Sequence, residues 1–340
     1  MLYGHGDDGY QYGKAILADF STNVWWGGEP VGLKEHVFQQ WKTINRYPEV
    51  LAESFRKEVS EWHQLRPEQV LACNGTAEAI YLLAHIFERQ RTAIAIPTFA
   101  EYEDACRLHH HQLTFVDWEK MMDSEALGTE LMDIELVFIC NPNNPTGAVL
   151  HSQQIESLLW RYPQTVFVVD EAYIAFTWAV ESVVSLLAHC PNLVILRSLT
   201  KTFAIPGLRL GYVLASDAII EKMEQVKYPW SVNTLAIEAG KFIIRNYPPV
   251  QPFLQILLAE KERFVSQLKQ LPGLQIGESQ THYFLVESLD MPASELKKHL
   301  IDNYGILIRD AGNFRSLSPR HFRLATLSPE KNALLLKAMS

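Results

Sequence analysis

Residues 136–147 read LVFICNPNNPTG, an apolar run of five residues followed by three asparagines and two prolines. The run is long enough for a strand, and its unbroken hydrophobicity indicates burial on both faces, as in a parallel sheet covered by helices. Asn, Pro and Gly all favour a tight turn after such a strand. The stretch therefore predicts a buried strand of an α/β sheet with polar side chains at its carboxyl end.

Outward from this stretch, the same order of strand, loop and helix recurs between about residues 50 and 215. After Asn74, apolar side chains at positions 80, 83, 84 and 87 have the spacing of one helix face. This alternation is typical of a doubly wound α/β domain with a mostly parallel, seven-stranded sheet. The predicted strands are residues 70–73, 93–96, 113–116, 136–140, 166–169, 193–196 and 212–215.

The pattern changes from about residue 216, where helical segments lead into short strands. The helices are expected within 235–244 and 254–271, and the strands at 275, 283–286 and 306–308. This order predicts a smaller α+β domain. We therefore divide the chain into a large domain of residues 42–235 and a small domain built from the N-terminal arm, residues 1–41, and residues 236–340. The first forty residues cannot fold alone and are expected to pack on the small domain or on a second subunit.

Composition excludes several classes of protein. Thirty basic and thirty-nine acidic residues give a formal charge of −9, which disfavours a general binder of nucleic acid or acidic membranes. The apolar runs are far shorter than the ~20 residues of a membrane span, and the first residues lack the features of a secretory signal. The spacing of the four cysteines matches neither a zinc site nor a disulfide framework, so we expect a cytoplasmic protein without a metal.

In an open α/β sheet, ligands bind beyond the carboxyl ends of the strands, and two polar segments lie there. Asp170 ends an apolar run, where a buried carboxylate costs several kcal/mol unless a cation pairs with it. Lys201 lies between Ser198 and Arg209 after another run. Taken alone, Asp170 is more commonly a helix cap and Lys201 part of a solvated face. Their order along the chain changes that interpretation.

In their order, the motifs resemble those of the fold-type I pyridoxal-phosphate enzymes, in particular the aminotransferase branch that contains histidinol-phosphate aminotransferase and the threonine-phosphate decarboxylase of cobalamin biosynthesis. The resemblance extends over essentially the whole chain. It implies the PLP-dependent transferase fold and pyridoxal 5'-phosphate as the cofactor. Each motif is weak alone; the ordered set is NRYPE at 45–49, NGT at 74–76, PTFAEY at 97–102, NPNNPTG at 141–147, DEAY at 170–173, residues 198–212 and FRLA at 322–325.

The resemblance implies a role for each side chain around the cofactor ring. Lys201 would form a Schiff base with the cofactor aldehyde and later move protons at the substrate Cα. Asp170 would face the pyridine nitrogen and keep it protonated, which makes the ring an electron sink. Tyr173 and Asn144 would hydrogen-bond the 3-oxygen of the ring, and Tyr102 would stack on its face.

The cofactor phosphate requires a helix N-terminus together with positive charge and hydroxyl groups. The resemblance implies an obligate homodimer in which Tyr47 reaches this phosphate from the neighbouring subunit. The residues expected to hold the phosphate within one subunit are Gly75, Thr76, Ala77, Ser198 and Arg209.

The substrate residues follow from the same resemblance. Arg323 is similar to the residue that binds the substrate α-carboxylate as a bidentate pair. His5 and Arg309 would hold a substrate phosphate, and Asn23 and Asn144 would complete the substrate site. The partner is therefore a small phosphorylated amino acid.

Segments outside the cofactor core are more similar to the decarboxylase, namely residues 5–6, 19–23, 229–233 and 306–314. The departure is Gly6-Asp7-Asp8 in place of Gly-Gly-Asn, which puts two carboxylates near the proposed anion site. Our hypothesis is PLP-dependent decarboxylation of L-threonine O-3-phosphate to (R)-1-amino-2-propanol O-2-phosphate. The alternative is transamination of histidinol phosphate or a related amino donor. The sequence leaves both open, because the reactions differ only in which bond at Cα stands perpendicular to the ring.

Three other readings are less consistent with the sequence. Residues 4–9 match the dinucleotide pattern G-x-G-x-x-G, but no strand can precede them, and their carboxylates would repel a pyrophosphate. The histidines at 109–111 lack the spacing of a metal site and suggest the polar end of a segment. A regulator that binds the cofactor without catalysis would need an added DNA-binding module, for which the chain has no basic segment.

Overall fold

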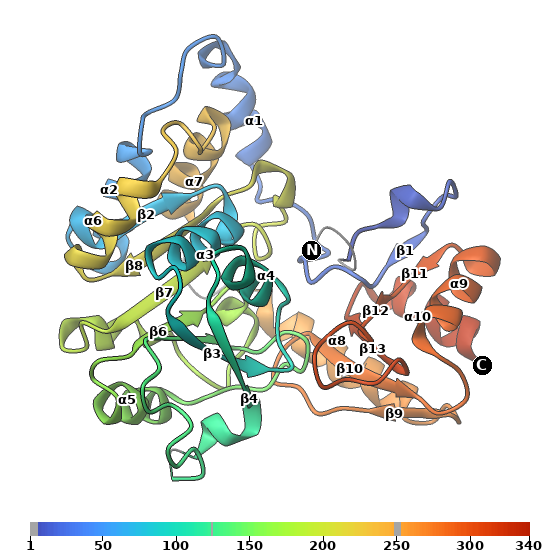
Figure 1. Cartoon of the computed structure of the whole chain (residues 1–340). Coiled ribbons are helices and arrows are strands. Elements are labelled where there is room, and N and C mark those ends of the chain that lie inside the picture. Colours follow the sequence, from blue (N-terminus) through green and yellow to red (C-terminus); the bar gives the residue numbers. More distant parts are fainter. Residues whose placement is uncertain (1–5, 124, 248–252) are drawn as a thin grey trace.

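The large domain is built on a mixed seven-stranded sheet (Figure 1). The computed structural model describes residues 6–123, 125–247 and 253–340. The strand order is β2-β8-β7-β6-β5-β3-β4, and β8 alone runs antiparallel to its neighbours. The predicted seven-stranded, mostly parallel sheet is confirmed. Its strands are β2 (Val70–Cys73), β3 (Arg91–Ile96), β4 (Gln112–Asp117), β5 (Leu136–Cys140), β6 (Val166–Asp170), β7 (Leu193–Ser198) and β8 (Gly211–Ala215).

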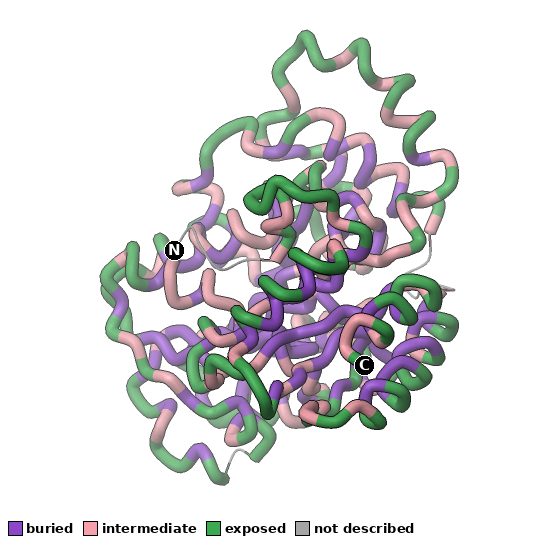
Figure 2. Tube along the Cα trace, turned by 90° about the vertical axis from the view of Figure 1, so that its right-hand side faces the viewer, coloured by how far each residue is buried: buried purple, intermediate pink, exposed green. Residues whose placement is uncertain are grey.

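The two faces of this sheet are buried by separate layers of helices. Along β5, Val137 and Ile139 join the hydrophobic cluster of one face, and Leu136 and Phe138 join that of the other, as the alternation of a pleated strand requires. Buried residues run through the centre of the molecule, and exposed residues lie on the outer helices (Figure 2). One layer contains α2 (Glu53–His63), α5 (Ser152–Arg161) and α7 (Thr234–Asn246), and the other contains α3 (Gly75–Ile86), α4 (Glu101–Leu108) and α6 (Asp217–Val226).

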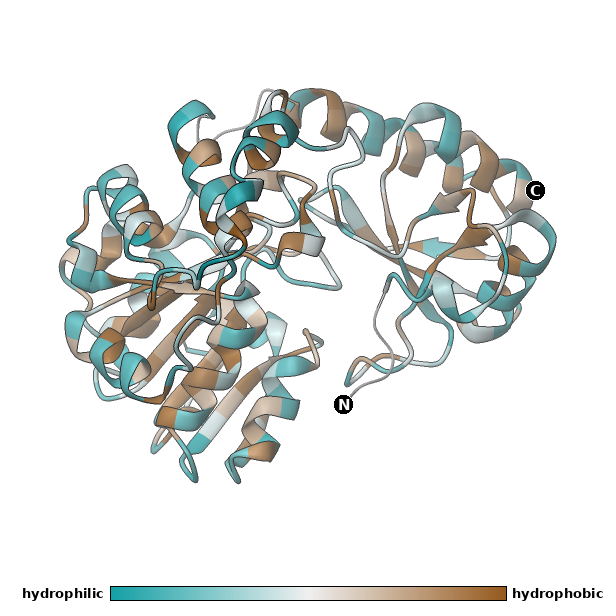
Figure 3. Ribbon diagram, turned by 90° about the horizontal axis from the view of Figure 1, so that it is seen from above, coloured by the Kyte–Doolittle hydropathy of each residue, from teal (hydrophilic) through white to brown (hydrophobic). Residues whose placement is uncertain are grey.

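The small domain is an antiparallel sheet of order β12-β13-β10-β9 with helices packed against it (Figure 3). Its strands are β9 (Leu274–Ile276), β10 (Tyr283–Ser288), β12 (Arg309–Asp310) and β13 (His321–Ala325), and its helices are α8 (Leu254–Leu268), α9 (Ala293–Tyr304) and α10 (Pro329–Met339). The predicted α+β character agrees with this arrangement, although β13 was identified from the sequence only as a motif.

The N-terminal arm contacts both domains. Residues 18–19 form β1 (Ala18–Asp19), which pairs in parallel with β11 (Ile306–Leu307), and the next residue, Phe20, is fully buried against Phe264 of α8. Farther along, α1 (Leu33–Gln39) packs on α7 instead, in the hydrophobic cluster of the large sheet. The proposed boundary at residue 235 lies inside α7, so residues 236–246 pack with the large sheet.

In the described residues, no helix is both long and apolar enough to cross a lipid bilayer. Short 3-10 helices lie between the longer elements. They are Gly9–Gln11, Trp41–Thr43, Pro67–Gln69, Trp118–Met122, Ile174–Phe176, Val183–Ala188 and Pro206–Leu208.

Candidate active site

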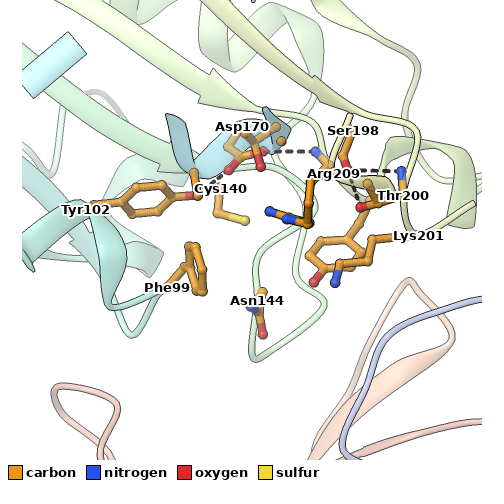
Figure 4. Close-up of a pocket in the computed structure, with 14 residues that line it drawn as sticks. Phe99, Tyr102, Cys140, Asn144, Asp170, Ser198, Thr200, Lys201 and Arg209 are labelled. Atoms are coloured by element: carbon orange, nitrogen blue, oxygen red, sulfur yellow. Dashed lines mark hydrogen bonds between the residues drawn. The ribbon is translucent and has the colours of Figure 1, made fainter. Parts of the chain in front are cut away.

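A cavity of about 130 Å³ lies at the carboxyl ends of the parallel strands. Asp170 ends β6, Ser198 ends β7, and Lys201 follows three residues later, so neighbouring strands bring all three side chains to one place (Figure 4). The residues that the sequence predicted for the cofactor line this cavity, with the exception of Tyr47. They are Gly75, Thr76, Ala77, Tyr102, Asn144, Asp170, Tyr173, Ser198, Lys201 and Arg209.

Asp170 is the most unusual group in the cavity, because its carboxylate is 4% exposed and pairs with no cation in the described residues. The Tyr102 hydroxyl donates to Oδ2 at 2.8 Å, and the Ala172 amide donates to Oδ1 at 3.0 Å. Burial raises the pKa of Asp170 to about 6, although these two hydrogen bonds oppose the rise. The site therefore provides a buried acceptor that would be stabilised by a positively charged N–H group.

Tyr102 makes contacts beyond the predicted stacking on a cofactor ring. Its own ring is fully buried and stacks on Phe138 of β5 at 5.0 Å between centroids. Because its hydroxyl is bound to Asp170, Tyr102 fixes the carboxylate from one side of the cavity. Stacking on the cofactor remains a prediction.

Lys201 provides the only amine among the residues that line this cavity. Burial lowers its pKa to about 8, and the nearby guanidinium groups of Arg209 and Arg323 add to the effect. In the described part of the chain, its Nζ makes no hydrogen bond. Its main-chain oxygen accepts a hydrogen bond of 3.0 Å from the Trp25 amide, so the N-terminal arm holds the loop that carries the lysine. A partly neutral amine of this kind is a competent nucleophile toward an aldehyde.

The N-terminus of α3 forms a cradle for an anion. Gly75 has φ +76°, and a Cβ atom there would lie 2.4 Å from Nη2 of Arg209, so the guanidinium occupies the space that a side chain would need. Helix α3 is twelve residues long, and its first amides point out of the helix end. The hydroxyls of Ser198 and Thr200 lie 2.8 Å apart at the same end of the cavity. This set of amides, hydroxyls and one guanidinium fits a phosphate group.

A second cavity of about 210 Å³ adjoins the first and is formed by both domains. Lys201, Asn144 and Tyr173 line both cavities, whereas Arg309 and Arg323 approach from the small domain. The predicted substrate residues Asn23, Asn144, Arg309 and Arg323 all line it, and His5 lies outside the described residues. Tyr173 is nearly buried, and burial raises its pKa to about 12, so its hydroxyl is a hydrogen-bond donor at neutral pH.

The two arginines are buried without an ion pair in the described residues. Arg323 is 5% exposed; its Nη1 donates to Asn144 Oδ1 and its Nη2 to the Ser21 main-chain oxygen, both at 2.5 Å, while Nε has no partner. Arg309 is 6% exposed, and its Nη2 donates to Asn313 Oδ1 at 2.9 Å. Burial, followed by repulsion from Arg323, lowers the pKa of Arg309 to about 10. Both groups stay charged at neutral pH and favour anionic ligands in this cavity.

The two carboxylates that depart from the family pattern have different surroundings. Asp8 accepts a hydrogen bond of 2.6 Å from Lys297, in an ion pair that is largely shielded from water. Asp7 is exposed at the rim of the second cavity, and its amide donates to Ser21 Oγ at 2.8 Å. Of these two carboxylates, only Asp7 lacks an ion pair with a cation of the described residues near the arginines.

Two contributors to the site were missed from the sequence. Thr200 lines the first cavity, and its hydroxyl beside the lysine is a signal that could have identified it. Ser21 binds Arg323 through its carbonyl oxygen, and the sequence contains no signal for such a main-chain contact.

Other expected features lie away from the cavities. His111 bonds Thr92 Oγ1 and the Ala84 carbonyl oxygen, so one of the three consecutive histidines has a structural role. In the described residues, no three His, Cys, Asp or Glu side chains are arranged to hold a metal ion. Tyr47 is 84% exposed and packs beside Trp230, outside the cavity of its own chain.

The geometry thus provides an amine, a buried carboxylate and a cradle that fits a phosphate. Similarity to known families identifies the cofactor that such a set of groups would bind. The family model described as aminotransferase class I and II matches residues 26–339. The chain belongs to this family. Class I and II aminotransferases depend on pyridoxal 5'-phosphate, so this cofactor is the group against which the first cavity is compared. Asp170, Lys201 and the cradle at Gly75 fit its ring nitrogen, aldehyde and phosphate.

Similar members of the family have two different activities in their names. A threonine-phosphate decarboxylase from Salmonella typhimurium is 33% identical over 333 residues, which cover 95% of this chain and 90% of that protein. Histidinol-phosphate aminotransferase 2 from Idiomarina loihiensis is 32% identical, covering 90% and 88%. The crystal structure of L-threonine-O-3-phosphate decarboxylase from Porphyromonas gingivalis superposes with a TM-score of 0.89 at 34% identity, covering 95% of this chain and 98% of that chain.

The lowered pKa of Lys201 predicts how fast cofactor-free protein captures pyridoxal phosphate. The neutral amine attacks the aldehyde, so with a pKa of about 8 the rate should increase as the pH rises through this value and level off above it. Stopped-flow absorbance of the lysine-bound cofactor measures this rate, with Lys201→Ala as the control that gives no such band. A rate that continues to rise to about pH 10.5, the pKa of an ordinary lysine, would contradict the proposed environment.

Proposed function

We propose that the protein decarboxylates L-threonine O-3-phosphate to (R)-1-amino-2-propanol O-2-phosphate, a step of cobalamin biosynthesis. The observation that carries the proposal is the pair of buried arginines, Arg309 and Arg323, which share one cavity with Lys201 and have no carboxylate partner in the described residues. The similar decarboxylases support the same conclusion.

The substrate's charges match these two arginines. A buried guanidinium without a counter-ion is costly, so two of them favour a ligand with two separated anionic groups. L-Threonine O-3-phosphate carries a carboxylate and a phosphate, whereas histidinol phosphate carries a phosphate alone. Arg323 would bind the α-carboxylate in place of its contact with Asn144, and Arg309 would bind the phosphate.

The chain's own groups then have separate tasks. Pyridoxal phosphate supplies a protonated ring that accepts the electron pair left at Cα when carbon dioxide departs. Asp170 would hold the ring nitrogen in its protonated form, and Tyr173 and Asn144 would bind the 3-oxygen. Arg323 and Arg309 would hold the carboxylate and the phosphate of the substrate and so orient the bond that breaks, and Lys201 would return a proton to Cα.

Decarboxylation and transamination give different products in the absence of any keto acid. Holoenzyme incubated with L-threonine O-3-phosphate should release carbon dioxide through many turnovers while the cofactor stays in its aldehyde form. Trapped carbon dioxide and the absorbance spectrum measure both quantities. L-Threonine without the phosphate is the matched control and should react far more slowly, because Arg309 then lacks its anion.

Stoichiometric conversion of the cofactor to its amine form without carbon dioxide would contradict this proposal. In that case, transamination of histidinol phosphate or a related donor becomes the main activity, which the similar aminotransferases support.

We further propose that the functional unit is a homodimer in which Tyr47 completes the partner's cofactor site. Large apolar side chains are exposed in the segments 38–50 and 228–230, and Trp230 of the second segment packs beside Tyr47, which favours burial in an interface. They are Phe38, Trp41, Ile44, Val50, Tyr228 and Trp230. The membership of the chain in a typically dimeric family supports this assembly.

Replacing Tyr47 by Phe tests this arrangement. Sedimentation should give a dimer for both the wild type and Tyr47→Phe, while the variant binds pyridoxal phosphate about 10-fold more weakly because a hydrogen bond to the phosphate is lost. Tyr304→Phe, on α9 of the small domain, is the matched control with unchanged affinity. A wild-type monomer, or equal affinity of Tyr47→Phe and wild type, would rule out the role of Tyr47.

A further inference from the structure

An ion pair joins the two domains near the cavity of about 210 Å³ that Arg309 and Arg323 line, here called the substrate cavity. Arg315, in the loop between β12 and β13 of the small domain, donates from Nε to Glu103 Oε2 at 3.0 Å and from Nη2 to Oε1 at 2.7 Å. Glu103 belongs to α4 of the large domain (Figure 1). The guanidinium carbon also lies 3.9 Å from the ring centroid of Phe115 on β4. Two parallel hydrogen bonds and a cation–π contact define the position of this side chain.

Glu103 also receives a hydrogen bond from within its own helix. Arg107 Nε donates to Glu103 Oε1 at 2.7 Å, one turn farther along α4. Partial burial opposes ionisation of Glu103, but the hydrogen bonds from Arg315 and Arg107 lower its pKa below the usual value. The carboxylate is therefore charged at neutral pH. Of its two arginine partners, Arg315 joins the domains and Arg107 does not.

The loop that carries Arg315 also holds the substrate arginine Arg309. Asn313, two residues before Arg315, accepts a hydrogen bond from Arg309 Nη2, and Phe314 lies 5.0 Å from the Arg309 guanidinium. Phe314 lines the substrate cavity and also a third cavity of about 440 Å³, which Arg315 and Phe115 line as well. Movement of Arg315 would therefore shift both neighbours of Arg309.

The loop has its own internal hydrogen bonds, which connect these residues mechanically. The Phe314 amide donates to the Ala311 oxygen at 3.1 Å, the Leu317 amide to the Phe314 oxygen at 3.1 Å, and the Gly312 amide to Asp310 Oδ1 at 2.9 Å. These short turns limit how far one part of the loop can move without the rest.

We propose that Arg315 is a positioning residue, which binds Glu103 and Phe115 of the large domain and thereby holds Arg309 in the orientation that binds the distal anionic group of the substrate. The role of Arg309 rests on the proposed function, whereas the contact between the domains does not. The side chains of Arg315 and Glu103 are 43% and 22% exposed, so the pair is weak enough to open when substrate enters or product leaves. Arg315 acts through Arg309 and does not touch the substrate.

The first part of the test measures the loop itself, in holoenzyme without substrate. Hydrogen exchange in peptides that cover residues 309–320 should be faster in Arg315→Gln than in the wild type, because the loop loses its anchor on α4. Arg107→Gln is the matched control, since it removes the other partner of Glu103 but leaves the contact between the domains. Its exchange should equal that of the wild type.

The second part measures the effect on substrate. Arg315→Gln should raise KM for L-threonine O-3-phosphate about 3- to 10-fold with little change in kcat, since a loosened Arg309 weakens ground-state and transition-state binding together. Arg315→Lys should recover only part of the affinity, because an ammonium cannot form two parallel bonds to Glu103. Raising salt from about 0.05 M to about 0.5 M should increase KM for the wild type more than for Arg315→Gln.

Each part has a result that overturns the proposal. Unchanged exchange in Arg315→Gln means that the ion pair does not hold the loop. Faster exchange with an unchanged KM means that the loop does not position Arg309. If the wild type does not turn over L-threonine O-3-phosphate, the proposed function has failed, and the exchange experiment still decides whether Arg315 anchors the loop.

Discussion

The site depends on one buried carboxylate. Asp170 ends the central strand β6, is 4% exposed and has a pKa raised to about 6 by burial. Such a group is destabilising unless a positive partner meets it, and we propose that the protonated ring nitrogen of pyridoxal phosphate is that partner. The hydroxyl of Tyr102 and the amide of Ala172 fix the carboxylate before the cofactor arrives. The rest of the cavity is arranged around the cofactor position that this contact defines.

The two domains contribute different groups to the site around Asp170. The large sheet positions the groups that line the first cavity, since Asp170 and Ser198 end neighbouring strands and Lys201 follows shortly after. The small domain contributes two buried cations, Arg309 and Arg323, from adjacent strands β12 and β13, and in the proposed function they bind the substrate. Substrate binding therefore depends on how the domains meet, and the contact between Arg315 and Glu103 lies at that junction.

Much of the fold and the cofactor site could be predicted, because both leave local patterns. Most of the seven strands are apolar runs, Asp170 ends one of them, and Lys201 lies three residues after the end of another. The sequence did not reveal β13 as a strand, because Arg323 interrupts its apolar pattern. Contacts such as Arg323 with the Ser21 oxygen, or Arg315 with Glu103, join residues 302 and 212 positions apart and have no local signature. Tyr47 as a partner's residue remains a prediction.

The most direct test of this account is the protonation state of the cofactor ring. Protein reconstituted with pyridoxal phosphate carrying ¹⁵N in the ring should give the chemical shift of a protonated pyridine nitrogen from about pH 6 to about pH 9. The reason is that the ionised Asp170 carboxylate stabilises the proton on the ring nitrogen. Asp170→Asn should give the shift of a neutral nitrogen over most of that range. A neutral nitrogen in the wild type at about pH 7 would contradict the central role of Asp170.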